Sequence, residues 1–261
     1  AGQVGAPAML WTVGFYDAFV ATMQARFADA EQLARSSVEA GVAMGAANVI
    51  AVFAGQAAVL AAIAGHRSEL PPAIAQAVEA GPVELTSRLA HAIVSVAGHP
   101  EGRREVARAF LDEAVAAGFR HVRPDLMWVT SMLGYATLAI ELEDLGAAAE
   151  LLAIIGPYTG EIATNLGPVA TYAGRLASLL GRHDLAEQHL TAAFAIADAF
   201  DWDYHRTAIL IARAAARRSA RPPSRPGQLD EQAQAWLATA ERICVARGLP
   251  RMLVAIEAIR G

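Results

Sequence analysis

Apolar residues recur along this chain at intervals of three and four, and short polar turns separate the apolar stretches. The most regular example is residues 166–200, where the helical period continues on both sides of a turn at residues 181–184. The small residues Gly174, Ala186 and Ala193 stand where the two helices would touch closely. No alternating run of apolar and polar residues is long enough to predict a strand. The pattern predicts an all-α fold of helical hairpins with no sheet.

A similar second helix recurs along the chain, with small or apolar residues at offsets of zero, four and seven. Its six occurrences are Ala30, Ala34 and Ser37; Ala73, Ala77 and Ala80; Ala107, Leu111 and Ala114; Ala149, Ala153 and Gly156; Ala186, Leu190 and Ala193; and Ala233, Leu237 and Ala240. Successive occurrences are about 34 to 47 residues apart, which brackets the period of helical-hairpin repeats. Because one hairpin cannot bury its apolar face alone, neighbouring hairpins stack. We expect residues 1–261 to form one domain, a right-handed superhelical solenoid of about six hairpins.

Proline and glycine mark the last hairpin and its end. Residues 217–228 are rich in arginine and proline, and proline is excluded from helix interiors, so we expect an exposed loop there inside the last hairpin. Gly248 and Pro250 then end the final repeat. Residues 251–260 are expected to form a C-terminal capping helix.

Composition and charge restrict the partners of such a domain. Hydrophobic residues make up 55% of the chain but aromatic residues only 7%, which suits close helix packing. The net charge of −5, from 26 acidic and 21 basic residues, gives no general attraction to nucleic acid or anionic lipid, and we expect no direct contact with either. The uncharged residues 40–65 are long enough to span a bilayer, but Gly41, Asn48 and Gln56 favour a buried solenoid helix over a membrane span.

The chain contains cysteine, histidine and acidic residues, but not at the spacings that catalytic or metal-binding sites require. The single cysteine, Cys244, excludes an internal disulfide, and we expect a cytoplasmic protein. No two of the seven histidines are three or four residues apart, and there is no zinc motif and no Gly-x-Ser-x-Gly sequence. Acidic pairs such as Glu141 and Glu143 are expected on hydrophilic helix faces. We predict that the chain is not an enzyme and uses no cofactor and no metal.

Several short segments resemble a known repeat family. Residues 181–187, Gly-Arg-His-Asp-Leu-Ala-Glu, and residues 25–31 resemble the mid-repeat turn of tetratricopeptide repeats, whose small consensus positions Gly174, Gly181, Ala186 and Ala193 match. Residues 155–158 and 167–174 are similar to the C-terminal repeat region of bacterial regulatory ATPases. These include MalT-like and LuxR-type activators and multidomain adenylate cyclases.

The resemblance implies a regulatory role. In that family an ATPase module couples the signal to the output, and the repeats sense a ligand or bind a partner. The chain has no P-loop motif and no terminal helix-turn-helix of the LuxR kind, and it begins at Ala1 without a methionine. We interpret it as the ligand-sensing part of a longer transcription-regulating protein, acting on other domains of the same protein. The alternative is a protein–protein interaction scaffold without a small-molecule ligand.

The first helix of each hairpin is expected to line a concave groove. With Gly174 as a fixed small position, Thr171, Arg175 and Ser178 are predicted to point inward, and the same register predicts this less securely for Arg206 and Arg213. Trp128, Ser131 and Tyr135 share one helical face, which belongs either to the core or to the groove. The predicted ligand site comprises Trp128, Ser131, Tyr135, Thr171, Arg175, Trp202 and Arg206.

The expected ligand of this groove is a polar small molecule or a peptide. Aromatic faces stack on sugar rings, and arginine binds anions with two parallel hydrogen bonds, so a carbohydrate or an anionic compound would suit these residues. A sensor should have an enclosed polar pocket, whereas a scaffold should present a broad open face.

Overall fold

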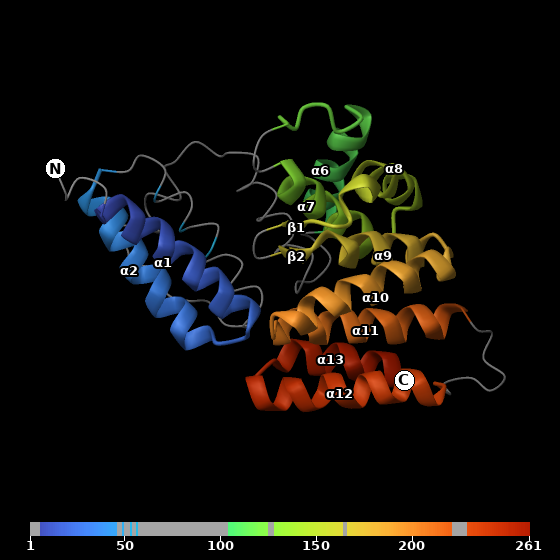
Figure 1. Ribbon diagram of the computed structural model, residues 1–261. Coiled ribbons are helices and arrows are strands. Elements are labelled where there is room, and N and C mark those ends of the chain that lie inside the picture. Colours follow the sequence, from blue (N-terminus) through green and yellow to red (C-terminus); the bar gives the residue numbers. More distant parts are fainter. Residues whose placement is uncertain are drawn as a thin grey trace.

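The computed structural model (Figure 1) describes residues 6–45, 49, 53, 56, 104–124, 128–163, 166–220 and 229–261, without the side chains of residues 6–10. Within these residues the chain forms ten α-helices, a 3₁₀ turn and one pair of two-residue strands. The predicted all-α class is confirmed. The predicted second helix of the second hairpin, with Ala73, Ala77 and Ala80, lies outside the described residues, as do Arg88 and Ser95, which the same register predicts to point inward from the third hairpin.

Most helices follow one another as hairpins. The helices are α1 (Ala6–Met23), α2 (Phe27–Ala43), α6 (Arg104–Ala116), α7 (Trp128–Glu141), α8 (Leu145–Ile155), α9 (Val169–Leu179), α10 (His183–Ala199), α11 (Asp203–Ala220), α12 (Glu231–Arg247) and α13 (Pro250–Arg260). Helices α1 and α2, α7 and α8, α9 and α10, and α11 and α12 pack together in pairs. From α7 to α13 the helices stack in chain order, apart from the exchanged positions of α12 and α13 (Figure 1).

The first helices of successive hairpins also touch one another. Helix α7 contacts α9, α9 contacts α11, and α11 contacts the C-terminal helix α13. The second helices α8, α10 and α12 each pack against the first helix before them and the helix after them. We call α7, α9, α11 and α13 the first-helix layer. This layer brings together side chains that are far apart in the sequence.

Helices α9 and α10 approach each other closely at Gly174. A Cβ atom on this residue would lie 2.6 Å from Cγ of Leu190 and 3.2 Å from the carbonyl oxygen of Ala186, closer than side chains pack in proteins. Ala186 and Ala193 are fully buried on the facing helix α10. The predicted close contact of α9 with α10 is confirmed.

The offset pattern of the second helices is confirmed in four of its occurrences. The sets that begin at Ala30, Ala107, Ala186 and Ala233 are all buried. The set predicted in α8 is wrong, because Ala149 and Ala153 are exposed. The buried set lies one residue earlier, at Ala148, Leu152 and Ile155. Residues 147–149 are three consecutive alanines, so the apolar pattern does not show which of them faces the core.

A short sheet departs from the prediction of a chain without strands. Strands β1 (Ile162–Ala163) and β2 (Gly167–Pro168) pair antiparallel, with Ile162 opposite Pro168. Gly167 has a φ of +79°, and a Cβ there would lie 2.4 Å from the ring of His205, so glycine is required for both reasons. Strands of two residues are too short to show a period, and the apolar pattern could not predict them.

The end of α11 corrects the predicted loop at residues 217–228. The helix continues through Arg217 and Arg218 to Ala220, and Arg217 Nε donates to Asp230 Oδ2 at 2.5 Å. Proline disfavours the helical conformation at the residue before it, here Arg221 before Pro222. A helix that ends at Ala220 is therefore compatible with this proline. Residues 221–228 lie outside the described part. The capping helix is confirmed as α13, which follows Gly248 in the left-handed conformation.

No helix among the described residues is long and apolar enough to cross a membrane. Of the uncharged residues 40–65, the structure describes 40–45 and the single positions 49, 53 and 56.

Candidate functional site

Helix α9 presents two half-buried polar side chains on the first-helix layer. Tyr172 and Arg175 are one turn apart and therefore share a face, while Ala173, Gly174 and Leu176 are buried. Arg175 Nη2 donates to Glu141 Oε1 of α7 at 3.1 Å. The guanidinium is thus held across two hairpins.

Two tyrosines interact electrostatically with this arginine. Burial raises the pKa of Tyr172 above its ordinary value of 10.0, and the neighbouring Tyr204 raises it further. Arg175 and a hydrogen bond with Thr137 act in the opposite direction and lower this pKa. Burial also raises the pKa of Tyr204 on α11, against the opposing effect of Arg175 and of Arg251 on α13. Both phenols therefore remain neutral at physiological pH and can donate as well as accept hydrogen bonds.

We call these six residues the tyrosine–arginine cluster. They come from four successive helices of the first-helix layer, and they are Thr137, Glu141, Tyr172, Arg175, Tyr204 and Arg251. The cluster offers neutral hydroxyls, guanidinium N–H groups and one carboxylate. Hydroxyl, guanidinium and carboxylate groups are those that form hydrogen bonds with polar ligands. A phenol whose pKa is raised is a poor general base, so the cluster suits binding better than proton transfer.

Of the predicted site residues, Arg175 belongs to the cluster. Trp128 packs edge-on against Tyr158, with 5.1 Å between ring centroids. Ser131 is buried, and Tyr135 is completely buried between Phe110 and Phe119.

Of the two interpretations for the face shared by Trp128, Ser131 and Tyr135, the structure places Ser131 and Tyr135 in the core. The hydroxyl of Tyr135 has a partner within the protein, the exposed His121, whose Nε2 lies 2.9 Å away. A buried polar tip with an internal partner needs no ligand.

Two of the remaining predicted residues, Trp202 and Arg206, lie near the turn between α10 and α11. Trp202 is buried and stacks on Phe200 at 5.1 Å between centroids. Arg206 pairs with Asp198 at 2.9 Å and with Asp203 at 3.2 Å, so its charge is matched by this turn. Thr171 is buried in α9. The structure does not bring these three residues into the tyrosine–arginine cluster.

The register predicted for α11 is wrong at Arg213. Its guanidinium pairs with Glu187 of α10 and lies 4.1 Å from the centroid of the Trp236 ring on α12. Arg213 therefore faces the second helices. Arg213 lies nine residues after Tyr204. At 3.6 residues per turn this is two and a half turns, so the two side chains lie on opposite faces of α11. An arginine at a seam between helices finds acidic partners that the sequence pattern cannot reveal.

Sequence reasoning missed Tyr172 and Tyr204. Each stands in the first turn of a first helix, in α9 and α11 respectively. That shared place is the signal that could have identified them. A search for inward residues relative to Gly174 selected Thr171 instead, one position away on a different face.

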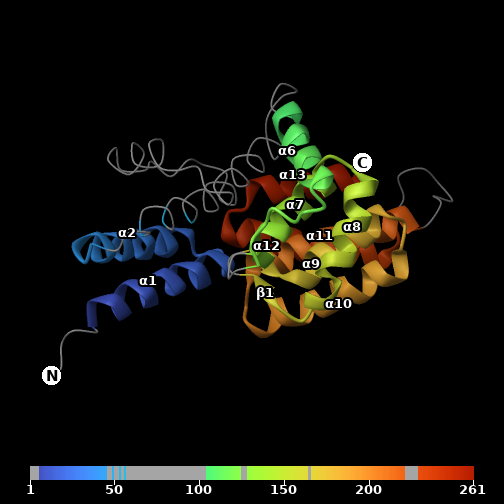
Figure 2. The ribbon, with the colours of Figure 1, turned by 90° about the horizontal axis from the view of Figure 1, so that it is seen from above.

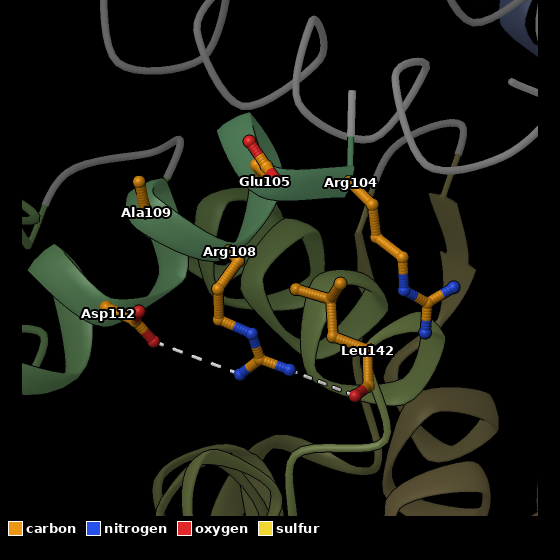
Figure 3. A pocket seen from close by; sticks show the side chains of 6 residues that line it. All are labelled: Arg104, Glu105, Arg108, Ala109, Asp112 and Leu142. Atoms are coloured by element: carbon orange, nitrogen blue, oxygen red, sulfur yellow. Dashed lines mark hydrogen bonds and ion pairs between the residues drawn. The ribbon is translucent and has the colours of Figure 1, made fainter. Parts of the chain in front are cut away.

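A second polar feature is a hollow of about 410 Å³ at α6, shown in Figure 3. It is lined by Arg104, Glu105, Arg108, Ala109, Asp112 and Leu142. Arg104 donates to the carbonyl of Glu141 at 2.9 Å, and Arg108 donates to that of Leu142 at 3.0 Å. These arginines satisfy carbonyl groups at the C-terminal end of α7, which gives them a structural role.

Comparisons with protein-family models, with curated proteins and with solved structures gave no match to this chain. Among the described residues no group of three or more histidine, cysteine, aspartate or glutamate side chains is placed to hold a metal ion. What can be inferred about function therefore comes from the tyrosine–arginine cluster.

Proposed function

We propose that the chain is a ligand-binding domain of a regulatory protein, a solenoid of about six helical hairpins capped by α13. Its first-helix layer binds an extended, polar segment of a partner protein. The observation that supports this proposal is the tyrosine–arginine cluster, whose members come from α7, α9, α11 and α13. The chain binds, and catalysis belongs to other domains.

The dimensions of the layer suit a peptide. Packed helices lie about 8–10 Å apart, so a ligand that crosses four successive first helices spans roughly 24–30 Å. An extended chain covers about 3.3 Å per residue, so roughly eight residues would fit. Carbonyl and N–H groups recur along such a chain and can pair with the hydroxyls of Tyr172 and Tyr204.

Arg175 provides the charged contact. Its bond to Glu141 uses one of five N–H donors and fixes the guanidinium in place, so less side-chain entropy is lost when a ligand binds. Arg251 adds a second positive charge from α13. A segment with carboxylate groups would complement both arginines.

A second candidate ligand is an oligosaccharide or another polar small molecule. The two tyrosine rings near Arg175 favour it, since aromatic faces stack on sugar rings. The resemblance to MalT-like and LuxR-type regulators also supports it. By that resemblance the domain acts in the cytoplasm, within a bacterial signal-transduction protein that controls transcription or cyclase output through its other domains.

The proposal is tested by selecting peptides from a random phage library on the full chain and measuring their affinities for three variants. We expect Arg175→Ala and Tyr204→Phe each to weaken binding about tenfold, or about 1.4 kcal/mol, because each removes donors from the cluster. The matched control is Arg242→Ala. This arginine is exposed on α12, where it donates to Thr239 at 3.3 Å.

Oligosaccharides are screened in parallel by thermal shift, since a ligand of the native state raises the apparent stability. If only oligosaccharides stabilise the chain, and Arg175→Ala abolishes the effect, the ligand is a sugar. If Arg175→Ala and Arg242→Ala bind every selected peptide as tightly as the parent does, the cluster is not the binding site.

A further inference from the structure

The first hairpin stands apart from the stacked helices, and its turn reaches them. Figures 1 and 2 show α1 and α2 extending away from the other helices, with the turn between them close to α11. Among the described elements, α2 makes extensive contact with α1 alone, and α1 makes further contact with α11.

The hairpin has a small core of its own. Ala18, Ala34 and Val38 of the hairpin form a separate buried cluster together with Val49 and Phe53, which follow α2 in the chain, and Trp11 and Leu33 pack against this cluster. A close approach of the two helices supports this core, because a Cβ on Gly14 would lie 3.3 Å from Cβ of Ser37. The described part of the hairpin is therefore held together by contacts that do not involve the stacked helices.

Three apolar residues around the turn pack against the C-terminal helices. Met23 belongs to the buried cluster that contains Ala170 and Trp202. Ala25 belongs to the cluster formed by α11, α12 and α13, against which Phe27 also packs. Tyr204 and Met252 are packed against this same cluster. Since α1 also contacts α11, the turn lies at the end of the first-helix layer formed by α11 and α13.

Ala25 shows that this turn differs from the other hairpin turns. It has a φ of +55°, in the left-handed region where glycine is favoured, and yet it is 6% exposed. Gly181 and Glu143 occupy the corresponding left-handed place in the α9–α10 and α7–α8 turns, and both are exposed. A Cβ on Gly181 would meet open space. An alanine therefore occupies a left-handed position that favours glycine, and its methyl group is buried against α11, α12 and α13.

We infer that the turn between α1 and α2 is an intramolecular cover for the end of the first-helix layer formed by α11 and α13, and that it leaves this end as a unit when a ligand binds. Among the described residues, the contact consists of a few apolar side chains at one end of a hairpin that has its own buried cluster. It can therefore open without unfolding either part. A partner segment that reaches Tyr204 and Arg251 competes with the turn. The inference rests on the proposed function in one respect, namely that the covered surface is the surface that binds the ligand.

The test uses Ala25→Asn in the full chain. Asparagine tolerates the left-handed conformation but is too large and too polar for the buried contact, so it should undock the turn and leave the hairpin folded. The matched control is Gly181→Asn, at the exposed left-handed position. Hydrogen exchange is measured with no ligand present, in peptides that cover the first turns of α11 and α13, together with oxidation of Met252 by hydroxyl radicals.

In Ala25→Asn we expect several-fold faster exchange in these first turns and several-fold more oxidation of Met252, with the unfolding midpoint of the stacked helices unchanged. Gly181→Asn should change neither signal. Unaltered exchange in Ala25→Asn would show that the turn is not docked in solution. Faster exchange in every helix, with a lower midpoint, would show that the hairpin is part of the cooperative core and not a cover. Either result overturns the inference, and neither depends on whether peptide selection succeeds.

Discussion

Gly174 shows how a single residue fixes the distance between two helices. Glycine in the middle of a helix normally lowers stability by up to about 1 kcal/mol relative to alanine. At Gly174 this relation should reverse, because a methyl group would lie 2.6 Å from Cγ of Leu190. Ala186 O, at 3.2 Å, belongs to the backbone and cannot move aside easily.

We therefore predict that Gly174→Ala destabilises the protein by about 1–2 kcal/mol, through overpacking of the α9–α10 contact. The control is Gly146→Ala in α8, where the nearest atom outside the backbone, Asp144 Oδ1, would be at an ordinary 3.5 Å. That variant should be neutral or slightly stabilised. Urea denaturation at 25 °C measures both. A Gly174→Ala protein at least as stable as the parent would contradict the tight packing.

At the scale of elements, Asp144 begins α8 and also joins it to α6. Its side chain caps the helix by accepting from the Ala147 N–H at 2.9 Å, and it forms an ion pair with Arg108. The Ala147 hydrogen bond, followed by Arg108 and partly opposed by burial, lowers the pKa of Asp144 below its ordinary value of 3.8. The folded state thus prefers the ionised carboxylate.

The stabilisation from Asp144 is complete above the unfolded-state pKa and is lost as the pH falls through 3.8 toward the lower folded-state pKa. Asp144→Asn keeps a capping oxygen but removes the charge and its titration. We predict that the parent loses more unfolding free energy than Asp144→Asn when the pH is lowered from 6 to 3. Equal losses in denaturant titrations at these two pH values would mean that Asp144 contributes no acid sensitivity.

At the scale of the whole molecule, Arg213 connects successive hairpins. It lies on α11, pairs with Glu187 of α10 and stacks on Trp236 of α12. Arg217 lies above the same ring at 5.8 Å and pairs with Asp230. Because repeats are stabilised by contacts with their nearest neighbours, these residues should control how strongly the last hairpin is coupled to the preceding one.

We predict that Arg213→Met costs about 1 kcal/mol, since it removes a cation–π contact and an ion pair with a partly exposed glutamate but keeps the apolar stem. The loss should be local, with faster hydrogen exchange in α12 and α13 and little change in α7 and α8. Arg242→Met, at an exposed position of α12, is the control and should exchange as the parent does. Uniform acceleration across all helices would show that the stack unfolds as one unit.

The sequence by itself determined the helical class, the α9–α10 hairpin with its glycine contact, the buried sets of four second helices and the capping helix. These features depend on residues that are close in the chain, since the two helices of a hairpin are joined by a short turn and their small residues face each other. The sequence also identified Arg175 as a polar residue in an apolar helix.

Only the tertiary structure decided which side chains meet between hairpins. Tyr172 and Tyr204 lie near Arg175, Tyr135 is enclosed in the core, and Arg213 points away from the first-helix layer. The rotation of each first helix about its axis depends on neighbours that lie 30 or more residues away. A long arginine can also reach acids on either side of its helix. The packing of Ala25 against the C-terminal helices could not be predicted either, because the sequence around this turn does not indicate which distant residues bury it.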